Sequence, residues 1–155
     1  MSVDNFSWVI PGKLGGCALP YLDGRHSDAK WLSEQGIKVL VSFVLPTGDA
    51  SEECAKHGIE WVYYPITDFD APEDTESFSA LIDNIVDAVK KGKGVCVHCR
   101  MGIGRTGLAL ACAVGKYLGL PADKAIAAVR KARPGSIETL VQERFIIGFL
   151  DGAGR

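Results

Sequence analysis

One segment constrains the fold more than any other: residues 95–118 pass from a short apolar run through a glycine-rich loop into a helix-forming stretch. Residues 95–97 have the pattern of a buried strand, whereas residues 108–118 are rich in alanine and leucine, which favour helix. Ligands in α/β proteins bind where a strand ends and a helix begins. The junction therefore predicts both the fold class and the place of a binding site.

The remainder of the chain repeats this alternation of strands and helices. Strands are predicted over residues 6–10, 14–19, 39–44, 59–66 and 95–97. Helices are predicted over residues 27–35, 49–57, 78–89, 108–118 and 121–131, the last of these with Pro121 in its first turn, and from a cap at Ser136 to Leu150. We expect one domain over residues 1–155, an α/β three-layer sandwich whose central, largely parallel sheet is flanked by helices.

Composition excludes several classes of protein. The net charge is −2, with 17 basic and 19 acidic residues, so no global basic field is available to hold nucleic acid or an anionic membrane. No apolar run is long enough to cross a bilayer, and the first residues lack a signal-peptide pattern. The five scattered cysteines argue against a secreted disulfide framework. We therefore expect a cytoplasmic monomer that acts without nucleic acid or membrane.

The loop at the junction has the residues of an anion-binding site. Its sequence over residues 97–107 is VHCRMGIGRTG. Glycines let the backbone curl so that successive N–H groups point inward, and the following helix adds the positive end of its dipole. An arginine six residues after Cys99 can grip an oxyanion with two parallel hydrogen bonds. The residues predicted to bind the anion are Arg100, Met101, Gly102, Ile103, Gly104 and Arg105.

The cysteine that opens this loop is a candidate nucleophile. The positive surroundings favour the ionised form of a thiol, and the hydroxyl of Thr106 can donate a hydrogen bond to the sulfur. A thiolate at the floor of an anion cradle is placed to attack phosphorus and form a phosphocysteine. We expect no metal and no cofactor, because Arg105 and the loop amides supply the positive charge that the transition state needs.

The segment HCRMGIGRT matches the signature His-Cys-x-x-Gly-x-x-Arg-Ser/Thr of the protein tyrosine and dual-specificity phosphatases. The wider chain resembles the small atypical dual-specificity phosphatases of the VHZ-like type, from NFSWVIPGKLGG near its start to RPGSIET at residues 133–139. The resemblance implies a cysteine-dependent phosphatase whose partners are phosphorylated proteins, acting on phosphotyrosine and on phosphoserine or phosphothreonine.

Cleavage of a phosphate ester also needs a proton for the leaving oxygen. The resemblance places this acid in the loop that follows the strand of residues 59–66, where Asp68 fits and Asp70 is the alternative. Glu73 and Asp74 are interpreted as charges at a helix start. Because Thr67 stands where related loops often carry proline, we expect a more mobile loop.

Three further residues have candidate roles by resemblance. His98 would orient the loop and keep the thiol acidic, with its side chain pointing away from the pocket. Glu138 or Gln142 would position the water that hydrolyses the phosphocysteine, although first-turn helix placement also explains Glu138. Arg133 either supports the loop or lies exposed at the surface. His98 with its two neighbouring thiols lacks a fourth ligand, so no metal site is expected.

Other activities share this loop. A phosphatase for phosphoinositides or for RNA 5′-phosphate would use the same mechanism, but the loop adds only Arg100 as a further cation. A pseudophosphatase that binds phosphoprotein without turnover is the third hypothesis. The intact Cys99, Arg105 and Thr106 argue against it.

Overall fold

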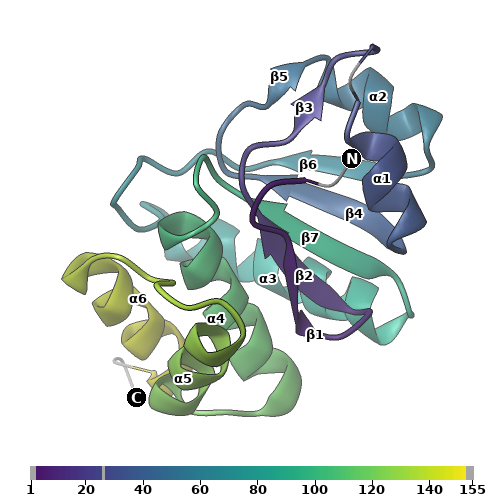
Figure 1. Ribbon diagram of the computed structural model, residues 1–155. Helices are drawn as coiled ribbons and strands as arrows, with labels where there is room; N and C mark the ends of the chain where they lie inside the picture. Colours follow the sequence, from purple (N-terminus) through teal and green to yellow (C-terminus); the bar gives the residue numbers. More distant parts are fainter. Residues whose placement is uncertain (1–2, 26, 153–155) are drawn as a thin grey trace.

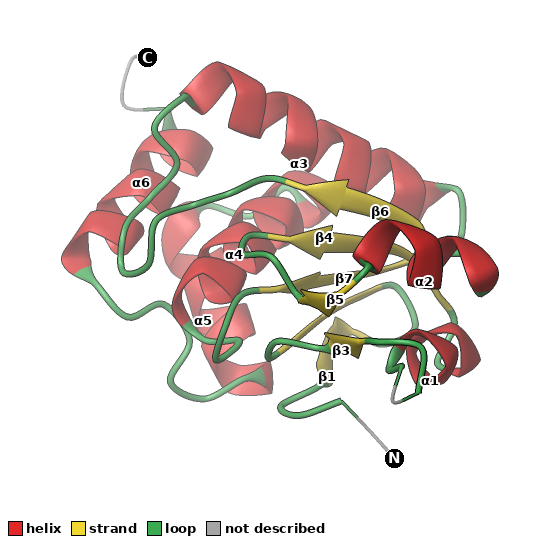
Figure 2. Cartoon of the chain, turned by 90° about the horizontal axis from the view of Figure 1, so that it is seen from above, coloured by secondary structure: helices red, strands yellow, loops and turns green. Residues whose placement is uncertain are grey.

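The computed structural model describes residues 3–25 and 27–152, which form a central sheet with helices on both faces (Figures 1 and 2). The strand order is β1-β2-β7-β4-β6, with β1 antiparallel to β2 and the other pairs parallel. The strands are β1 (Ser7–Ile10), β2 (Leu14–Cys17), β7 (Gly94–His98), β4 (Ile37–Ser42) and β6 (Glu60–Tyr63). The predicted α/β sandwich with a largely parallel sheet is confirmed.

The helices divide into two layers, which Figure 2 shows on opposite sides of the sheet. One layer holds α1 (Ala29–Glu34) and α2 (Ala50–Lys56). The other holds α3 (Thr75–Lys90), α4 (Gly104–Leu118), α5 (Ala122–Ala132) and α6 (Leu140–Asp151). None of the helices that the structure describes has the length and apolar character needed to cross a membrane.

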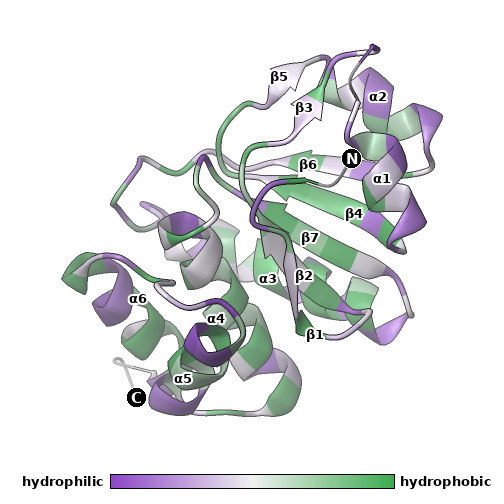
Figure 3. Ribbon diagram, viewed as in Figure 1, coloured by the Kyte–Doolittle hydropathy of each residue, from purple (hydrophilic) through white to green (hydrophobic). Residues whose placement is uncertain are grey.

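Alternate residues of the central strands supply the two cores. Val39 and Val41 of β4 pack in the core beneath α3 to α6, whereas Leu40 between them packs with α1 and α2. This alternation follows from the two-residue period of a strand. Because both faces are covered, the central strands are apolar over most of their length, as the green parts of β4 and β7 show in Figure 3.

The parallel strands bring three loops to one edge of the sheet. Ser42, at the end of β4, lies in register with His98 at the end of β7 and with Tyr63 at the end of β6. The segments that follow these strands therefore start side by side. One of them is the glycine-rich loop, and another contains the acidic residues 68–74.

Two predicted boundaries differ near this edge. The strand predicted over residues 59–66 ends at Tyr63, since Pro65 has no N–H to continue the ladder. Helix α4 begins at Gly104, four residues earlier than expected. The two glycines of its first turn have low helix propensity, but the amide of Gly107 bonds to the carbonyl of Ile103 at 3.0 Å. The helix therefore starts directly at the loop.

The cap predicted at Ser136 is wrong. Helix α6 begins after Thr139, whose hydroxyl accepts a hydrogen bond from the amide of Gln142, while the Gln142 side chain accepts one from the Thr139 amide. Between Ser136 and Thr139, Ile137 has a φ of +68°, which a helix does not allow. Pro121 likewise occupies the cap position of α5 and not its first turn.

Two short strands have no counterpart in the sequence prediction. They are β3 (Tyr21–Leu22) and β5 (Thr47–Gly48), which pair in parallel as a separate two-stranded sheet. Two residues are too few to show a strand period, so only the tertiary contact reveals them.

Candidate active site

The carbonyl groups of the loop between β7 and α4 accept hydrogen bonds from groups outside the loop. Each carbonyl of residues 99–103 accepts a hydrogen bond from a different donor. The pairs are Cys99 with Nδ1 of His98 (2.9 Å), Arg100 with the amide of Leu19 (2.9 Å), Met101 with Nδ2 of Asn5 (3.0 Å), Gly102 with Nη2 of Arg133 (2.5 Å) and Ile103 with the amide of Ile137 (3.1 Å).

This arrangement fixes the direction of the loop amides. A peptide unit points its N–H opposite to its C=O, so outward carbonyls leave the amides facing the interior of the loop. Among the hydrogen bonds that the structure describes, none has an amide of residues 100–103 as its donor. Together with the N-terminus of α4, these amides form a concave site for an anion.

The two loop glycines leave room for different neighbours. Gly102 has a φ of +77°, and a Cβ there would lie 2.6 Å from the carbonyl carbon of Cys17. A Cβ on Gly104 would lie 2.5 Å from Oε1 of Glu138 and 3.0 Å from Nε2 of Gln142. The absence of side chains therefore lets the loop rest on β2 and against the start of α6.

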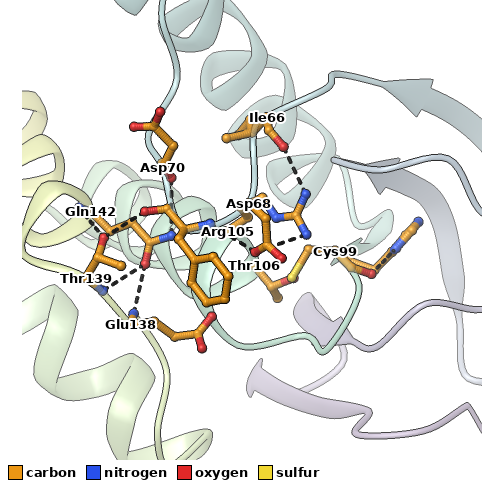
Figure 4. Close-up of polar contacts among 11 residues, drawn as sticks. Ile66, Asp68, Asp70, Cys99, Arg105, Thr106, Glu138, Thr139 and Gln142 are labelled. Carbon is orange, nitrogen blue, oxygen red and sulfur yellow. Dashed lines mark hydrogen bonds and ion pairs between the residues drawn. The ribbon is translucent and has the colours of Figure 1, made fainter.

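Cys99 and Thr106 meet at the floor of the loop (Figure 4). The Thr106 hydroxyl donates to the sulfur of Cys99 at 3.1 Å, and Thr106 itself is fully buried on the first turn of α4. Such a donor stabilises the ionised form of the sulfur more than the neutral one. The predicted contact between these two side chains is confirmed.

The guanidinium of Arg105 is almost fully buried and only partly satisfied. Nη1 donates to the carbonyl of Ile66 at 2.9 Å, and Nη2 lies 3.3 Å from Oδ1 of Asp68. Nε is buried without a hydrogen-bond partner among the described residues. Leaving a buried donor unpaired is costly, so Nε is the atom that an oxyanion in the loop would satisfy.

Of the two acids considered in the preceding loop, Asp68 faces this site. Its carboxylate lies beside Arg105, whereas that of Asp70 points away (Figure 4). Oδ1 of Asp70 accepts a hydrogen bond from the amide of Ala71 at 2.8 Å. Asp74 caps α3, accepting a hydrogen bond from the amide of Glu76, as its interpretation as a helix-start charge requires.

The start of helix α6 binds the loop of residues 67–74, which contains the candidate acids and is called the acid loop below. The hydroxyl of Thr139 donates to the carbonyl of Phe69 at 3.1 Å, and Nε2 of Gln142 donates to the carbonyl of Asp70 at 3.2 Å. Phe69 has a φ of +61°, which is uncommon for a residue with a side chain and is fixed here by these contacts. The loop expected to be mobile because of Thr67 is thus held by the capping residues of α6.

The two candidates for positioning water differ in freedom. Gln142 is fully buried, and both ends of its amide are bound to backbone groups, including the amide of Glu138 at 2.8 Å. The carboxylate of Glu138 lies against Gly104 at the loop, and its residue is exposed. Glu138 is therefore the side chain of the two that can turn toward a water molecule.

His98 is fully buried behind the loop and does not face its interior. Nδ1 donates to the carbonyl of Cys99, which leaves Nε2 to accept from the hydroxyl of Ser42 at 2.5 Å. The Ser42 oxygen in turn accepts from the indole N–H of Trp61 at 2.8 Å. Burial lowers the pKa of His98 to about 4, so the ring is neutral at physiological pH and orients the loop without adding charge.

Sequence reasoning missed several of these contributors. Asn5, Ser42 and Thr139 reach the site from segments far away in the chain. Asn5 and Thr139 lie in the two segments that carry the resemblance, but the sequence pattern assigned none of the three a contact in the site. Arg133, left open between support and exposure, is buried with its guanidinium on the loop.

A strand, a loop with inward amides, a thiol and a buried arginine on the next helix define the class of cysteine-based phosphate-binding sites. The family described as "Polymorphic toxin system, DSP-PTPase phosphatase" (Tc-R-P) matches residues 20–117. The chain therefore belongs to this DSP-PTPase family, within the cysteine-based protein tyrosine phosphatase superfamily.

Two relatives and two crystal structures agree with this assignment. Tyrosine-protein phosphatase cdc-14 of Caenorhabditis elegans is 31% identical over 145 residues, which cover 86% of this chain and 20% of that protein. Protein tyrosine phosphatase domain-containing protein 1 of Mus musculus is 32% identical over 123 residues, covering 68% of this chain and 16% of that protein. The chain thus spans a fifth or less of the length of these two relatives.

The structural matches extend over almost the whole chain. The crystal structure of Tk-PTP in the active form has a TM-score of 0.83 and 26% identity, covering 96% of this chain and 97% of that one. The structure of kinase associated phosphatase has a TM-score of 0.81 at 23% identity, covering 97% of this chain and 96% of that one, and supports the fold.

The buried imidazole predicts a dependence of stability on pH. Because the pKa of His98 is about 4 in the folded state and about 6.5 in an unfolded chain, the unfolded state binds the proton first as the pH falls from about 6.5 to 4. Stability should therefore decrease over this range, by about 3 kcal/mol from this group. Urea unfolding at pH 7 and pH 4 measures it.

Over the same pH range, the free energy of unfolding of His98→Asn should decrease by about 3 kcal/mol less than that of the native chain. His57→Asn is the control and should behave like the native chain. Equal losses in all three proteins would show that His98 takes up its proton as readily in the folded state as in the unfolded one.

Proposed function

We propose that this chain is a cysteine-dependent phosphatase that hydrolyses phosphotyrosine, and phosphoserine or phosphothreonine, in proteins. The observation that carries the proposal is the set of outward carbonyls over residues 99–103, because they leave the amides facing the interior of the loop that Cys99 opens. The unpaired Nε of Arg105 adds a cationic donor to the site.

In the first step, the Cys99 thiolate attacks phosphorus in line with the leaving oxygen. A sulfur–phosphorus bond forms as the phosphorus–oxygen bond breaks, and Asp68 gives its proton to the leaving oxygen. The loop amides and Arg105 stabilise the three equatorial oxygens, on which charge spreads in the transition state. The position of Asp68 supports this role, since its carboxyl group lies 3.3 Å from Nη2 of the arginine that would bind the phosphate.

In the second step, water hydrolyses the phosphocysteine. The Asp68 carboxylate takes a proton from the water as its oxygen attacks phosphorus, and the sulfur leaves as a thiolate stabilised by Thr106. Glu138 orients this water from the start of α6, because its carboxylate adjoins the loop at Gly104.

The charges around the site favour a phosphorylated protein side chain as substrate. The carboxylates of Asp68 and Glu138 lie beside the loop, while Arg100 is the single cation that the loop adds to Arg105. A ligand with several phosphates would be repelled by these carboxylates. A cavity of about 570 Å³ beside Arg105, lined in part by Tyr63 and Tyr64, offers room for residues next to the phosphorylated one.

Replacing the nucleophile separates binding from turnover. Cys99→Ser should reduce turnover of para-nitrophenyl phosphate by about 10³-fold or more, because a serine hydroxyl at this site lacks the nucleophilicity of a thiolate. Binding of tungstate, measured by calorimetry, should persist because the amides and Arg105 remain. Cys54→Ala, on α2 at the opposite face of the sheet, is the control and should keep its turnover. If Cys99→Ser kept its turnover, Cys99 would not be the nucleophile.

The acid assignment predicts a dependence on the leaving group. Asp68→Asn should reduce kcat for phenyl phosphate by about 10²-fold or more, and much less for para-nitrophenyl phosphate, whose leaving group needs no proton. Asp70→Asn is the matched control and should leave both rates nearly unchanged. If the loss appeared in the Asp70 variant instead, the acid would be Asp70.

A substrate comparison tests the proposed class. Phosphotyrosine peptides, phosphothreonine peptides, a phosphoinositide in vesicles and RNA with a 5′-triphosphate are offered to the same preparation, and kcat/KM is measured. We expect the phosphopeptides to give the highest values. A higher value for the phosphoinositide or the RNA would assign the chain to one of the two alternative substrate classes.

A further inference from the structure

Arg133 is a buried arginine whose described hydrogen bonds all go to neutral groups. It follows the last residue of α5, at the end that packs beside β1 (Figure 1). The residue is 4% exposed. Nη1 donates to the carbonyl of Asn5, the hydroxyl of Ser7 and the carbonyl of Gly16, each at 2.8 Å, and Nη2 donates to the carbonyl of Gly102 at 2.5 Å.

No carboxylate among the described residues forms an ion pair with this guanidinium. By contrast Arg130, one turn earlier on α5, pairs with Glu143 at 2.9 Å. Burial lowers the pKa of Arg133, yet a guanidinium keeps its proton in proteins. A buried charge without a counter-charge is strongly unfavourable unless the site supplies an anion.

Three thiols are close enough to Arg133 to act on the pKa of its guanidinium. They come from three neighbouring segments: Cys17 from β2, Cys96 from β7 and Cys99 from the loop, and each of them as a thiolate would raise the pKa of Arg133. The hydrogen bond with Cys96, together with burial, raises the pKa of Cys17 and keeps that thiol neutral. Among these three, Cys99 is the thiol that the proposed function requires as an anion.

The guanidinium also lies close to the residue that binds the Cys99 sulfur. A Cβ on Gly16 would lie 3.3 Å from Cζ of Arg133 and 2.7 Å from Cγ2 of Thr106. Arg133 and Thr106, whose hydroxyl donates to that sulfur, therefore pack against the same side of Gly16. Because water does not reach this region, a charge there acts over a longer distance than at the surface.

We propose that Arg133 is a second cation of the phosphate site, a positioning residue that fixes the Gly102 carbonyl and whose unpaired charge stabilises the Cys99 thiolate and a bound phosphate. It acts from beneath the loop, and Arg105 grips the phosphate directly. The inference rests on the proposed function, since it names a further residue of the same site.

Charge and geometry are separated by two substitutions at this position. Arg133→Gln removes the positive charge, whereas Arg133→Lys keeps the charge but lacks the planar guanidinium that donates several hydrogen bonds at once. The measurement is the pH midpoint for alkylation of Cys99 by iodoacetamide, followed by mass spectrometry. We expect the midpoint of Arg133→Gln to rise by about one pH unit and inhibition by vanadate to weaken about tenfold, with much smaller changes for Arg133→Lys.

A second pair of variants leaves Arg133 in place. Ser7 accepts a hydrogen bond from Nη1, so Ser7→Asp supplies the missing counter-charge and Ser7→Asn is its neutral counterpart. The alkylation midpoint of Ser7→Asp should be higher than that of Ser7→Asn. This comparison also decides the matter if Arg133→Gln does not fold.

Arg144→Gln, an exposed position on α6, controls for the loss of one positive charge and should leave the midpoint unchanged. Equal midpoints in Ser7→Asp and Ser7→Asn, or equal shifts in Arg133→Gln and Arg133→Lys, would overturn the role of the charge. Alkylation of Cys99 does not require turnover. If the chain had no phosphatase activity, the proposed function would be wrong, but the alkylation midpoint would still measure the effect of Arg133.

Discussion

The site depends on one constraint, which is that the carbonyls of residues 99–103 face outward. A glycine-rich loop by itself has many conformations, and in most of them its amides do not converge. Here each carbonyl has a donor from the surrounding structure, including the side chains of Asn5 and Arg133. The anion-binding geometry is therefore a property of the assembled fold, and it exists only when the N-terminal segment and the region after α5 are in place.

The buried polar groups around this loop differ in how the free energy lost on desolvation is offset. His98 loses its charge, because an imidazole releases its proton near neutral pH when it is desolvated. A guanidinium cannot do so, and Arg105 and Arg133 remain charged inside the protein. Their backbone acceptors offset part of the desolvation, and the remaining positive charge is directed at the place where an anion is expected.

The start of α6 shows how one short segment serves several purposes. Thr139 and Gln142 cap the helix for each other, and the same two side chains hold the carbonyls of Phe69 and Asp70. The acid loop and the helix are thus fixed together. The sequence predicted a cap at Ser136, but the left-handed backbone of Ile137, which the local pattern does not reveal, lies between Ser136 and the helix, and Thr139 is the cap.

The sequence by itself determined the α/β class, the strand and helix on either side of the loop, and the placement of Cys99 and Arg105 at the two ends of that loop, because these depend on residue periodicity and short spacing. Only the tertiary structure decided which carboxylate faces the site and which residues hold the loop. Asn5 and Met101 are 96 residues apart, and Arg133 and Asn5 are 128 apart. Contacts over such separations leave no periodic trace in a single sequence, since they arise from how the elements pack and not from the conformation of any one of them.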